Sequence, residues 1–179
     1  MFRRFYPDYE AESAYLLDYE ALYEAGFRGI IYDIDNTLVP HGAAADERAI
    51  ALFLRLRKLG FQTQLLSNNK EPRVKPFADA VGSAYTYKAG KPGRDGYEQA
   101  MEKMGTKPSE TLLIGDQLFT DVWGARRVGI KAILVKPIHP REEIQIVIKR
   151  RLERIVLFFF HRSRFARTAP QRKSKEDIG

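Results

Sequence analysis

The chain contains no cysteine among its 179 residues. This absence excludes disulfide bonds, thiolate zinc sites and catalytic thiols, and it fits a reducing compartment such as the cytoplasm. Long apolar runs are also missing: the run at residues 155–160 has six residues, whereas a membrane span needs about 20. The N-terminal region lacks an apolar segment followed by a small-residue cleavage site, so we expect no secretory signal. These absences favour a cytoplasmic protein without a membrane-spanning helix.

Positive charge is concentrated at the C-terminal end. The chain has 30 Lys and Arg against 23 Asp and Glu, a net charge of +7. Residues 149–179 hold ten of the basic residues and three of the acidic ones, which accounts for the whole excess. We therefore expect the basic character to belong to a C-terminal appendage rather than to the main domain.

The length and composition fit one globular domain with terminal additions. We expect an N-terminal amphipathic segment at 1–27, a main domain at 28–140, and a basic amphipathic helix with a polar tail at 141–179. Within the first segment, residues 8–25 have apolar side chains at helical spacing and predict a helix ended by Gly26. The helix either packs on the domain or faces a membrane or partner. The spaced residues are Tyr15, Leu16, Tyr19, Leu22 and Tyr23.

Strand-like and helix-like patterns alternate between residues 28 and 137. This alternation, with short connections, predicts an α/β fold: a doubly wound, Rossmann-like parallel sheet with helices on both faces. Ligands of such sheets bind beyond the carboxyl ends of the strands. The expected strands are 29–32, 61–66, 84–87, 111–114 and 132–135, and the expected helices are 46–59, 72–81, 94–104 and 121–128.

Polar clusters follow four of the predicted strands. Asp33 and Asp35 follow the first strand, and because strand side chains alternate, both are expected on the same side. Their mutual repulsion would be relieved by a divalent cation or by a phosphoryl group with its counter-ions. The other clusters are Ser67 with Asn68, Lys91, and Asp116 with Asp121. We expect the four strand ends to converge on one site.

The residue types in these clusters suit phosphoryl transfer. A carboxylate such as Asp33 can attack phosphorus and form an acyl phosphate that water then cleaves. Asp35 can protonate the leaving oxygen and then activate that water. The phosphoryl oxygens need cationic and hydrogen-bonding partners, which Lys91, Ser67 and Thr37 can supply.

Hard oxygen ligands for Mg²⁺ are offered by Asp33 and Asp116. Asp121, near a predicted helix start, fits an N-cap as well as a supporting role at the metal. A calcium-binding loop that begins at Asp33 is excluded, because Leu38 stands where glycine is needed and Ala44 where glutamate is needed. Taken singly, each of these motifs also fits a turn, a helix cap or a surface residue, and the prediction depends on their combination and order.

In this order, the motifs resemble those of the haloacid dehalogenase-like phosphatase superfamily, subfamily IIIA. They read DIDNTL at 33–38, LSNN at 66–69, KP at 91–92 and GDQLFTD at 115–121, and the resemblance covers about residues 28–137. It implies that Asp33 is the nucleophile and that Asp35 is the acid/base and also a metal ligand through its backbone carbonyl. It further implies that Ser67 and Lys91 hold the phosphate with Asn68 in the same motif, that Asp116 binds magnesium, that Asp121 supports it, and that Thr37 orients the acid/base segment.

The spacing of the motifs leaves no room for a cap domain. Asp33 and Ser67 are 34 positions apart, and Ser67 and Lys91 are 24 apart. Stretches of this length have room only for the loops and helices that connect one strand of the sheet to the next. An open site favours a large substrate, or closure by a partner or a membrane, over a small sugar phosphate.

The C-terminal segment predicts a basic amphipathic helix at residues 142–160, followed by a frayed polar tail at 162–179. Such a helix can lie on an anionic membrane surface. The alternative is that its apolar face packs on the sheet or in a dimer. Its apolar positions are Ile144, Ile148, Leu152, Ile155 and Phe159, and its basic residues are Lys149, Arg150, Arg151 and Arg154.

The open site and the basic helix together resemble the phosphatidylglycerophosphate phosphatase group. The resemblance implies a phospholipid substrate and a peripheral position on the inner membrane face. His41, Lys70 and Arg73 then become candidates for contact with the neighbouring phosphodiester, with surface or capping roles as the alternative. Other open functions are a phosphatase for a protein or nucleic-acid phosphate, and a ribonucleoprotein-binding regulatory module with a vestigial site. The sequence leaves the physiological substrate and the oligomeric state open.

Overall fold

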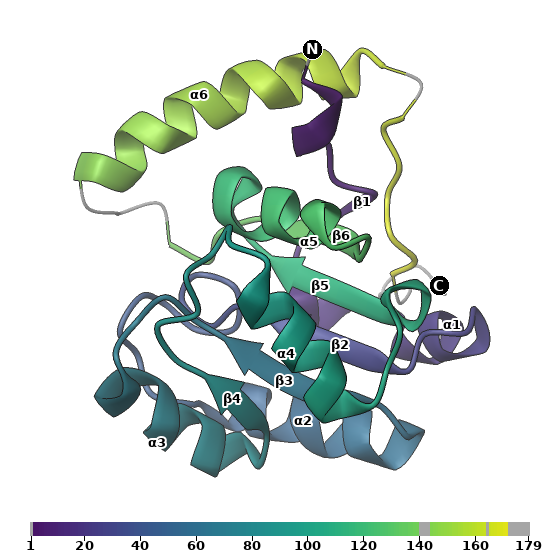
Figure 1. Ribbon diagram of the computed structural model, residues 1–179, viewed down its shortest axis with the longest axis vertical. Coiled ribbons are helices and arrows are strands. Elements are labelled where there is room, and N and C mark those ends of the chain that lie inside the picture. The colour runs from purple at the N-terminus through teal and green to yellow at the C-terminus, as the bar shows by residue number, and fades with distance from the viewer. Residues whose placement is uncertain (1, 140–143, 164, 172–179) are drawn as a thin grey trace, which may run out of the picture.

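The computed structural model describes residues 2–139, 144–163 and 165–171, with residues 144–150 described by their backbone alone. In these ranges six parallel strands form one sheet in the order β1-β6-β5-β2-β3-β4. Helices cover both faces of the sheet (Figure 1), which confirms the predicted doubly wound α/β fold. The strands are β1 Tyr9–Ala11, β2 Gly29–Tyr32, β3 Gln62–Leu66, β4 Ala84–Thr86, β5 Thr111–Gly115 and β6 Lys131–Val135. The α-helices are α1 Tyr19–Glu24, α2 Glu47–Leu59, α3 Glu71–Val81, α4 Asp95–Met104, α5 Trp123–Arg127 and α6 Ile144–His161.

Four shorter helical turns complete the described structure. Three are 3₁₀ turns and one, η4, is a π-helix directly after β5. They are η1 Arg3–Phe5, η2 Ala14–Leu16, η3 Pro108–Glu110 and η4 Leu118–Val122.

The central strand β2 separates two apolar cores. Its side chains alternate between the faces, so Ile30 and Tyr32 join the core under α2, with Phe53. Ile31 joins the core on the opposite face, with Tyr97 of α4. Because all four residues of β2 are buried, the strand is covered on both sides, as its continuous apolar sequence predicts.

Most helices of the main domain begin and end near the predicted boundaries. Asp46 caps α2 by accepting a hydrogen bond from the Ala49 N–H at 2.8 Å. Gly60 ends α2 with a φ of 95°, a left-handed conformation that glycine adopts without a Cβ penalty.

The predicted helix over residues 8–25 is wrong for most of its length. The structure has β1, η2 and only the short α1 there. Tyr9 of β1 lies opposite Ile133 of β6. On the other edge of β1, the Glu10 N–H donates to the Arg167 carbonyl, and Glu10 accepts from the Ala169 N–H, both at 2.8 Å. Pairing on both edges outweighs the helical spacing, since tertiary contacts override local propensity.

The C-terminal helix is present as α6, although residues 142–143 lie outside the described ranges. It packs on the domain through buried Val156 and Phe160. The predicted frayed tail is wrong for residues 165–171, since Ala169 is buried and this segment lies along β1. Residues 172–179 of that prediction lie outside the described ranges. The boundaries at 27/28 and 140/141 stay a prediction.

Candidate active site

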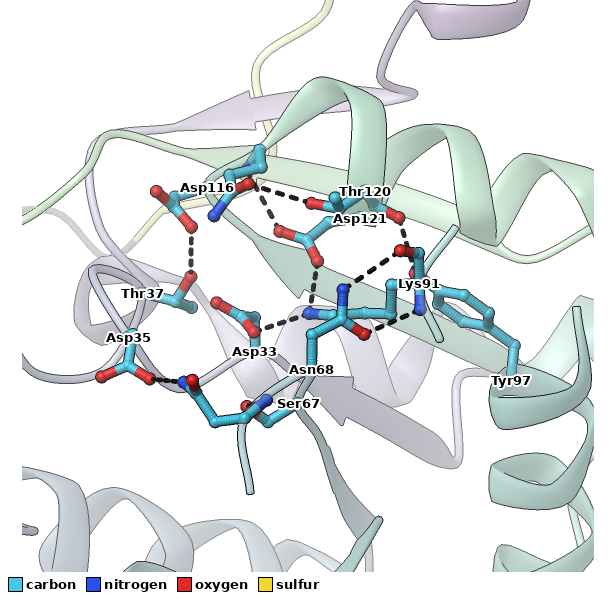
Figure 2. A network of polar contacts seen from close by, with 12 residues as sticks. Asp33, Asp35, Thr37, Ser67, Asn68, Lys91, Tyr97, Asp116, Thr120 and Asp121 are labelled. Carbon is cyan, nitrogen blue, oxygen red and sulfur yellow. Dashed lines mark hydrogen bonds and ion pairs between the residues drawn. The ribbon is translucent and has the colours of Figure 1, made fainter. Parts of the chain in front are cut away.

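The carboxyl ends of neighbouring strands bring the predicted polar residues together (Figure 2). Asp33 follows β2, Ser67 follows β3, and Asp116 follows β5. Lys91 lies in the connection from β4 to α4. All four side chains are buried, so their charges and hydrogen-bonding groups act on one another with little screening by water.

Lys91 links two carboxylates at the centre of the site. Its ammonium Nζ donates to Asp33 Oδ1 at 2.6 Å and to Asp121 Oδ1 at 2.7 Å. Carboxylate oxygens of Asp33, Asp116 and Asp121 lie within 4.8 Å of one another. Two buried carboxylates therefore share one ammonium group, so their negative charges exceed its positive charge, and the Asp116 carboxylate lies close to both.

This imbalance appears in the proton affinities of the site. Burial raises the pKa of Asp33 to about 7, with Asp121 adding to the rise and Lys91 opposing it. Burial lowers the pKa of Lys91, but the nearby Asp121 and Asp33 outweigh that effect and raise its pKa overall. Lys91 thus stays charged, yet its charge is shared between two carboxylates and does not fully compensate Asp33.

The carboxylate group fits a divalent cation. Mg²⁺ prefers hard oxygen ligands from carboxylates, water and phosphate, and three such carboxylates meet here within the span that one ion can bridge. A doubly charged cation would also offset the excess negative charge. The donor set and its charge are therefore suited to the metal that the sequence predicts.

Asp121 is held by its own loop. Its Oδ2 accepts from the Gln117 N–H at 3.1 Å, and its side chain has no exposed surface. It does not cap a helix, since the start of α5 has no side-chain cap. A Cβ added at Gly115 would lie 2.6 Å from the Asp121 carboxyl carbon, so the absence of a side chain at Gly115 leaves the space that this carboxylate fills.

Asp35 is separated from this group. It lies beyond β2, before Asn36, whose φ of 63° turns the chain. Its Oδ1 accepts from Arg73 Nη2 at 2.8 Å and from the Gly42 N–H at 2.7 Å, and its Oδ2 accepts from Asn69 Nδ2 at 2.7 Å. Figure 2 shows it set apart from the carboxylates around Lys91. Asp35 nevertheless lies near enough to Asp33 for its charge to add to the raised pKa of Asp33, and the expectation that both side chains lie on the same side stays a prediction.

Two of the three residues beside the motifs are exposed. His41 and Lys70 lie at the surface. Arg73 instead forms an ion pair with Asp35, so its guanidinium is already bound to the predicted acid/base. A contact of these residues with a phosphodiester stays a prediction.

The predicted substrate-binding side chains contact protein groups within the site. Thr37 Oγ1 donates to Asp116 Oδ1 at 3.3 Å. The Asn68 carboxamide donates to the Lys91 carbonyl at 3.1 Å and accepts from its N–H at 2.8 Å. Ser67 Oγ accepts from the Asn69 N–H at 3.1 Å. These contacts position Asp116, Lys91 and the loop after β3, while direct binding of substrate by these residues stays a prediction.

Sequence reasoning missed Tyr97. This buried residue of α4 donates its hydroxyl hydrogen to the Thr120 carbonyl at 2.8 Å, next to Asp121 (Figure 2). A Cβ at Gly124 would lie 2.3 Å from the Tyr97 hydroxyl, so the tyrosine packs tightly against α5. In the sequence it is one more apolar position of a predicted helix, and no local pattern marks it.

Comparison with known proteins agrees with this geometry. The family model for haloacid dehalogenase-like hydrolases matches residues 42–129. The probable phosphatase YqeG of Bacillus subtilis is 36% identical over 159 residues, which cover 88% of this chain and 92% of that protein. Phosphatidylglycerophosphate phosphatase 1, chloroplastic/mitochondrial, of Arabidopsis thaliana is 29% identical over 170 residues. That match covers 84% of this chain and 47% of the plant protein, so the chain spans about half of its length.

A solved structure shares the fold. The hypothetical protein XCC2798 from Xanthomonas campestris superimposes with a TM-score of 0.50 at 18% identity, over 75% of this chain and 76% of that one. The stretch matched by the family model holds the second, third and fourth motifs. The chain belongs to the haloacid dehalogenase-like hydrolase family and is a phosphatase.

Proposed function

We propose that the chain is a Mg²⁺-dependent phosphomonoesterase that acts through an aspartyl phosphate. The observation that carries this proposal is the group of three buried carboxylates, two of which bind the ammonium of Lys91. Asp33 is the nucleophile in the proposal: its carboxylate oxygen attacks phosphorus as the bond to the leaving oxygen breaks. In the proposal, a cation and the Lys91 ammonium beside this carboxylate would both neutralise the phosphoryl oxygens.

Asp35 is the proposed acid and base. It donates a proton to the leaving oxygen in the first step. In the second step it takes a proton from water, which attacks phosphorus, releases inorganic phosphate and restores the Asp33 carboxylate. The hydrogen bonds from Arg73, Asn69 and Gly42 hold the Asp35 carboxyl group in place between these steps.

The remaining site residues bind and position groups in the proposal. Mg²⁺, when bound, would offset charge on the phosphoryl oxygens. Asp33, Asp116 and the backbone carbonyl of Asp35 would hold the ion. Lys91 and Ser67 would bind phosphoryl oxygens, and Asp121 would keep the ammonium of Lys91 beside Asp33, where it lies in the structure.

The proposed substrate is a membrane phospholipid such as phosphatidylglycerophosphate. The name of the Arabidopsis relative supports this substrate. Between Asp33 and Lys91, a stretch that the structure describes in full, the chain forms α2, β3, α3 and β4 and no cap domain. An open site of this kind admits a phosphate whose large remainder stays outside.

A peripheral membrane position is part of the same proposal. In the described part of the chain, no helix has both the length and the apolar character to span a bilayer. On α6, however, Leu152, Ile155, Phe158 and Phe159 are about half exposed. Arg151 and Arg154 are exposed on the same helix, and apolar side chains with interspersed arginines suit the surface of an anionic membrane.

Phosphate release tests the proposal directly. Vesicles with phosphatidylglycerophosphate, soluble sugar phosphates and nucleotides would be compared with Mg²⁺ and after chelation, with Asp33→Asn as the blank. We expect release from the vesicles that depends on Mg²⁺ and disappears in the variant. Robust release from a sugar phosphate alone would refute the lipid assignment, and unchanged activity of Asp33→Asn would refute the mechanism.

A further inference from the structure

An open hollow of about 370 Å³ on the surface between η1 and α5 is lined by four arginines and a tryptophan. Arg3 and Arg4 come from η1, and Trp123, Arg126 and Arg127 come from α5. In the described part of the chain, this arginine hollow shares no residue with the carboxylate group of the candidate active site. It is therefore a separate feature of the surface.

Two of the four guanidinium groups are hydrogen-bonded to uncharged carbonyls. Arg126 Nε donates to the Tyr6 carbonyl at 2.7 Å, and Arg127 Nη1 donates to the Pro92 carbonyl at 2.9 Å. The Arg127 guanidinium also lies over the ring of Trp123, 5.5 Å from its centroid. Because a guanidinium has five N–H donors, each group keeps donors for a ligand. Its position is set before the ligand binds, which lowers the entropic cost of binding.

The positive charge of the arginine hollow is compensated only in part. In the described ranges, the only acid paired with these arginines is Asp8, whose Oδ1 lies 3.6 Å from Arg126 Nη1. Arg3 and Arg4 are exposed, and Arg3 lies over the ring of Phe165 at 4.3 Å from its centroid, a contact that leaves its charge in place. Four positive charges thus face one negative charge. An anion would relieve their mutual repulsion.

Aromatic residues connect the arginine hollow to α6. Phe5 of η1 lies edge-on to Trp123 with ring centroids 5.4 Å apart. Phe2, directly before η1, stacks on Phe159 of α6 with centroids 5.7 Å apart. Phe158 and Phe159 are about half exposed. The arginines therefore lie near apolar side chains that are open to solvent.

We propose that the arginine hollow is a second anion-binding site, which takes the phosphate group of an anionic lipid headgroup or of a soluble phosphate compound. The planar guanidinium group suits phosphate because two of its N–H groups can donate to two phosphate oxygens. An open hollow walled by arginines holds such a group by charge rather than by enclosure. The nearby apolar side chains of α6 favour a lipid as the source. The site goes beyond the proposed phosphatase reaction, because no step of that reaction uses it.

Two probes test the site without hydrolysis, both after chelation of metal ions. Inorganic pyrophosphate is the soluble probe, measured by calorimetry. Phosphatidylcholine vesicles with and without phosphatidylglycerol are the lipid probe, measured by sedimentation. Without a cation the carboxylate group keeps its excess negative charge and should not hold an anion. We expect the wild type to bind at least one probe, and Arg4→Gln and Arg127→Gln to bind it about tenfold more weakly or worse, because each loses hydrogen bonds between charged groups.

The matched control is Arg57→Gln. Arg57 is exposed in the last turn of α2 and donates its Nη1 to the Val81 carbonyl at 2.7 Å. Arg127 has the same place in α5 and the same kind of contact with Pro92. The control loses the same charge and should bind both probes as the wild type does. Thermal denaturation would show that each variant is folded.

The outcomes separate the site from a general effect of charge. Equal weakening in Arg57→Gln overturns the proposal, as does a wild type that binds neither probe, or arginine variants that bind as the wild type does. Each of these results leaves the phosphatase chemistry standing, because hydrolysis is not measured. Weakened binding of phosphatidylglycerol vesicles alone supports the site and identifies a lipid headgroup as its ligand. Weakened binding of pyrophosphate alone supports the site and identifies a soluble phosphate compound.

Discussion

Replacement of Gly115 by alanine would push a methyl group into the carboxylate of Asp121. The added Cβ would lie 2.6 Å from Asp121 Cγ and Oδ2, closer than such atoms can approach. Asp121 has no free space, because its side chain is fully buried and bound to Lys91 and to the Gln117 N–H. The substitution must therefore displace Asp121, Lys91 or both.

The size of the effect follows from this geometry. Overpacking in a core costs about 1–3 kcal/mol, and in a chain of this size each kcal/mol lowers the Tm by roughly 2–4 °C. We expect Gly115→Ala to unfold roughly 2–12 °C lower than the wild type. Displacement of a catalytic group by about 1 Å can cost roughly 100-fold in rate, so we also expect a large fall in kcat.

Gly29→Ala is the matched control. Its Cβ would lie 2.7 Å from Thr106 Oγ1, a comparable clash at the start of β2, the end opposite to the carboxylate group. It should lower the Tm without a comparable loss of activity. Thermal denaturation and hydrolysis of p-nitrophenyl phosphate would be measured on both variants. A Gly115→Ala variant that loses stability but keeps wild-type kcat would refute the predicted displacement of Asp121 and Lys91.

Three further predictions concern pH, packing and the missed tyrosine. The pKa of Asp33 is raised from 3.8 to about 7 in the folded state, so the folded protein binds this proton more tightly than the unfolded chain does. The stability of the metal-free protein should therefore fall as the pH rises from about 4 to 7. Added Mg²⁺ should raise the Tm more at pH 8 than at pH 5, and equal shifts at both pH values would contradict this. Phe160→Ala should cost about 3–5 kcal/mol in urea unfolding, whereas Phe158→Ala, half exposed, should cost far less; similar losses would show that α6 is not anchored through Phe160. Tyr97→Phe removes the hydroxyl that donates a hydrogen bond to the Thr120 carbonyl. We expect the variant to lose about 1–3 kcal/mol of stability and to have a lower kcat. A stability loss with unchanged kcat would exclude a positioning role for Tyr97.

The parts of the fold that were predictable are those with a strong local signal. The continuous apolar residues of β2 and the glycines that end α2, α3 and α4 mark their elements in the sequence. The strand β1 has three residues, and its neighbours β6 and residues 167–169 are more than a hundred positions away. Pairing between such distant segments leaves no local pattern in the sequence. The helical spacing of the apolar residues near β1 therefore led to the wrong prediction of a helix.

The site was predictable in its residue types but not in its contacts. Strand ends brought Asp33, Lys91 and Asp116 together because parallel strands share one carboxyl edge. The position of the Asp35 side chain depends on its ion pair with Arg73 of α3 and on the chain turn at the next residue, Asn36. Contacts between separate elements depend on packing, which residue spacing does not describe.

The segment along β1 has a consequence for solubility. A strand at the border of a sheet offers unpaired N–H and carbonyl groups to any other chain, which favours association between molecules. Here residues 167–169 occupy that border through backbone hydrogen bonds with Glu10. The last described residues of the chain thus shield the first strand from self-association, and a chain truncated before residue 165 would expose it.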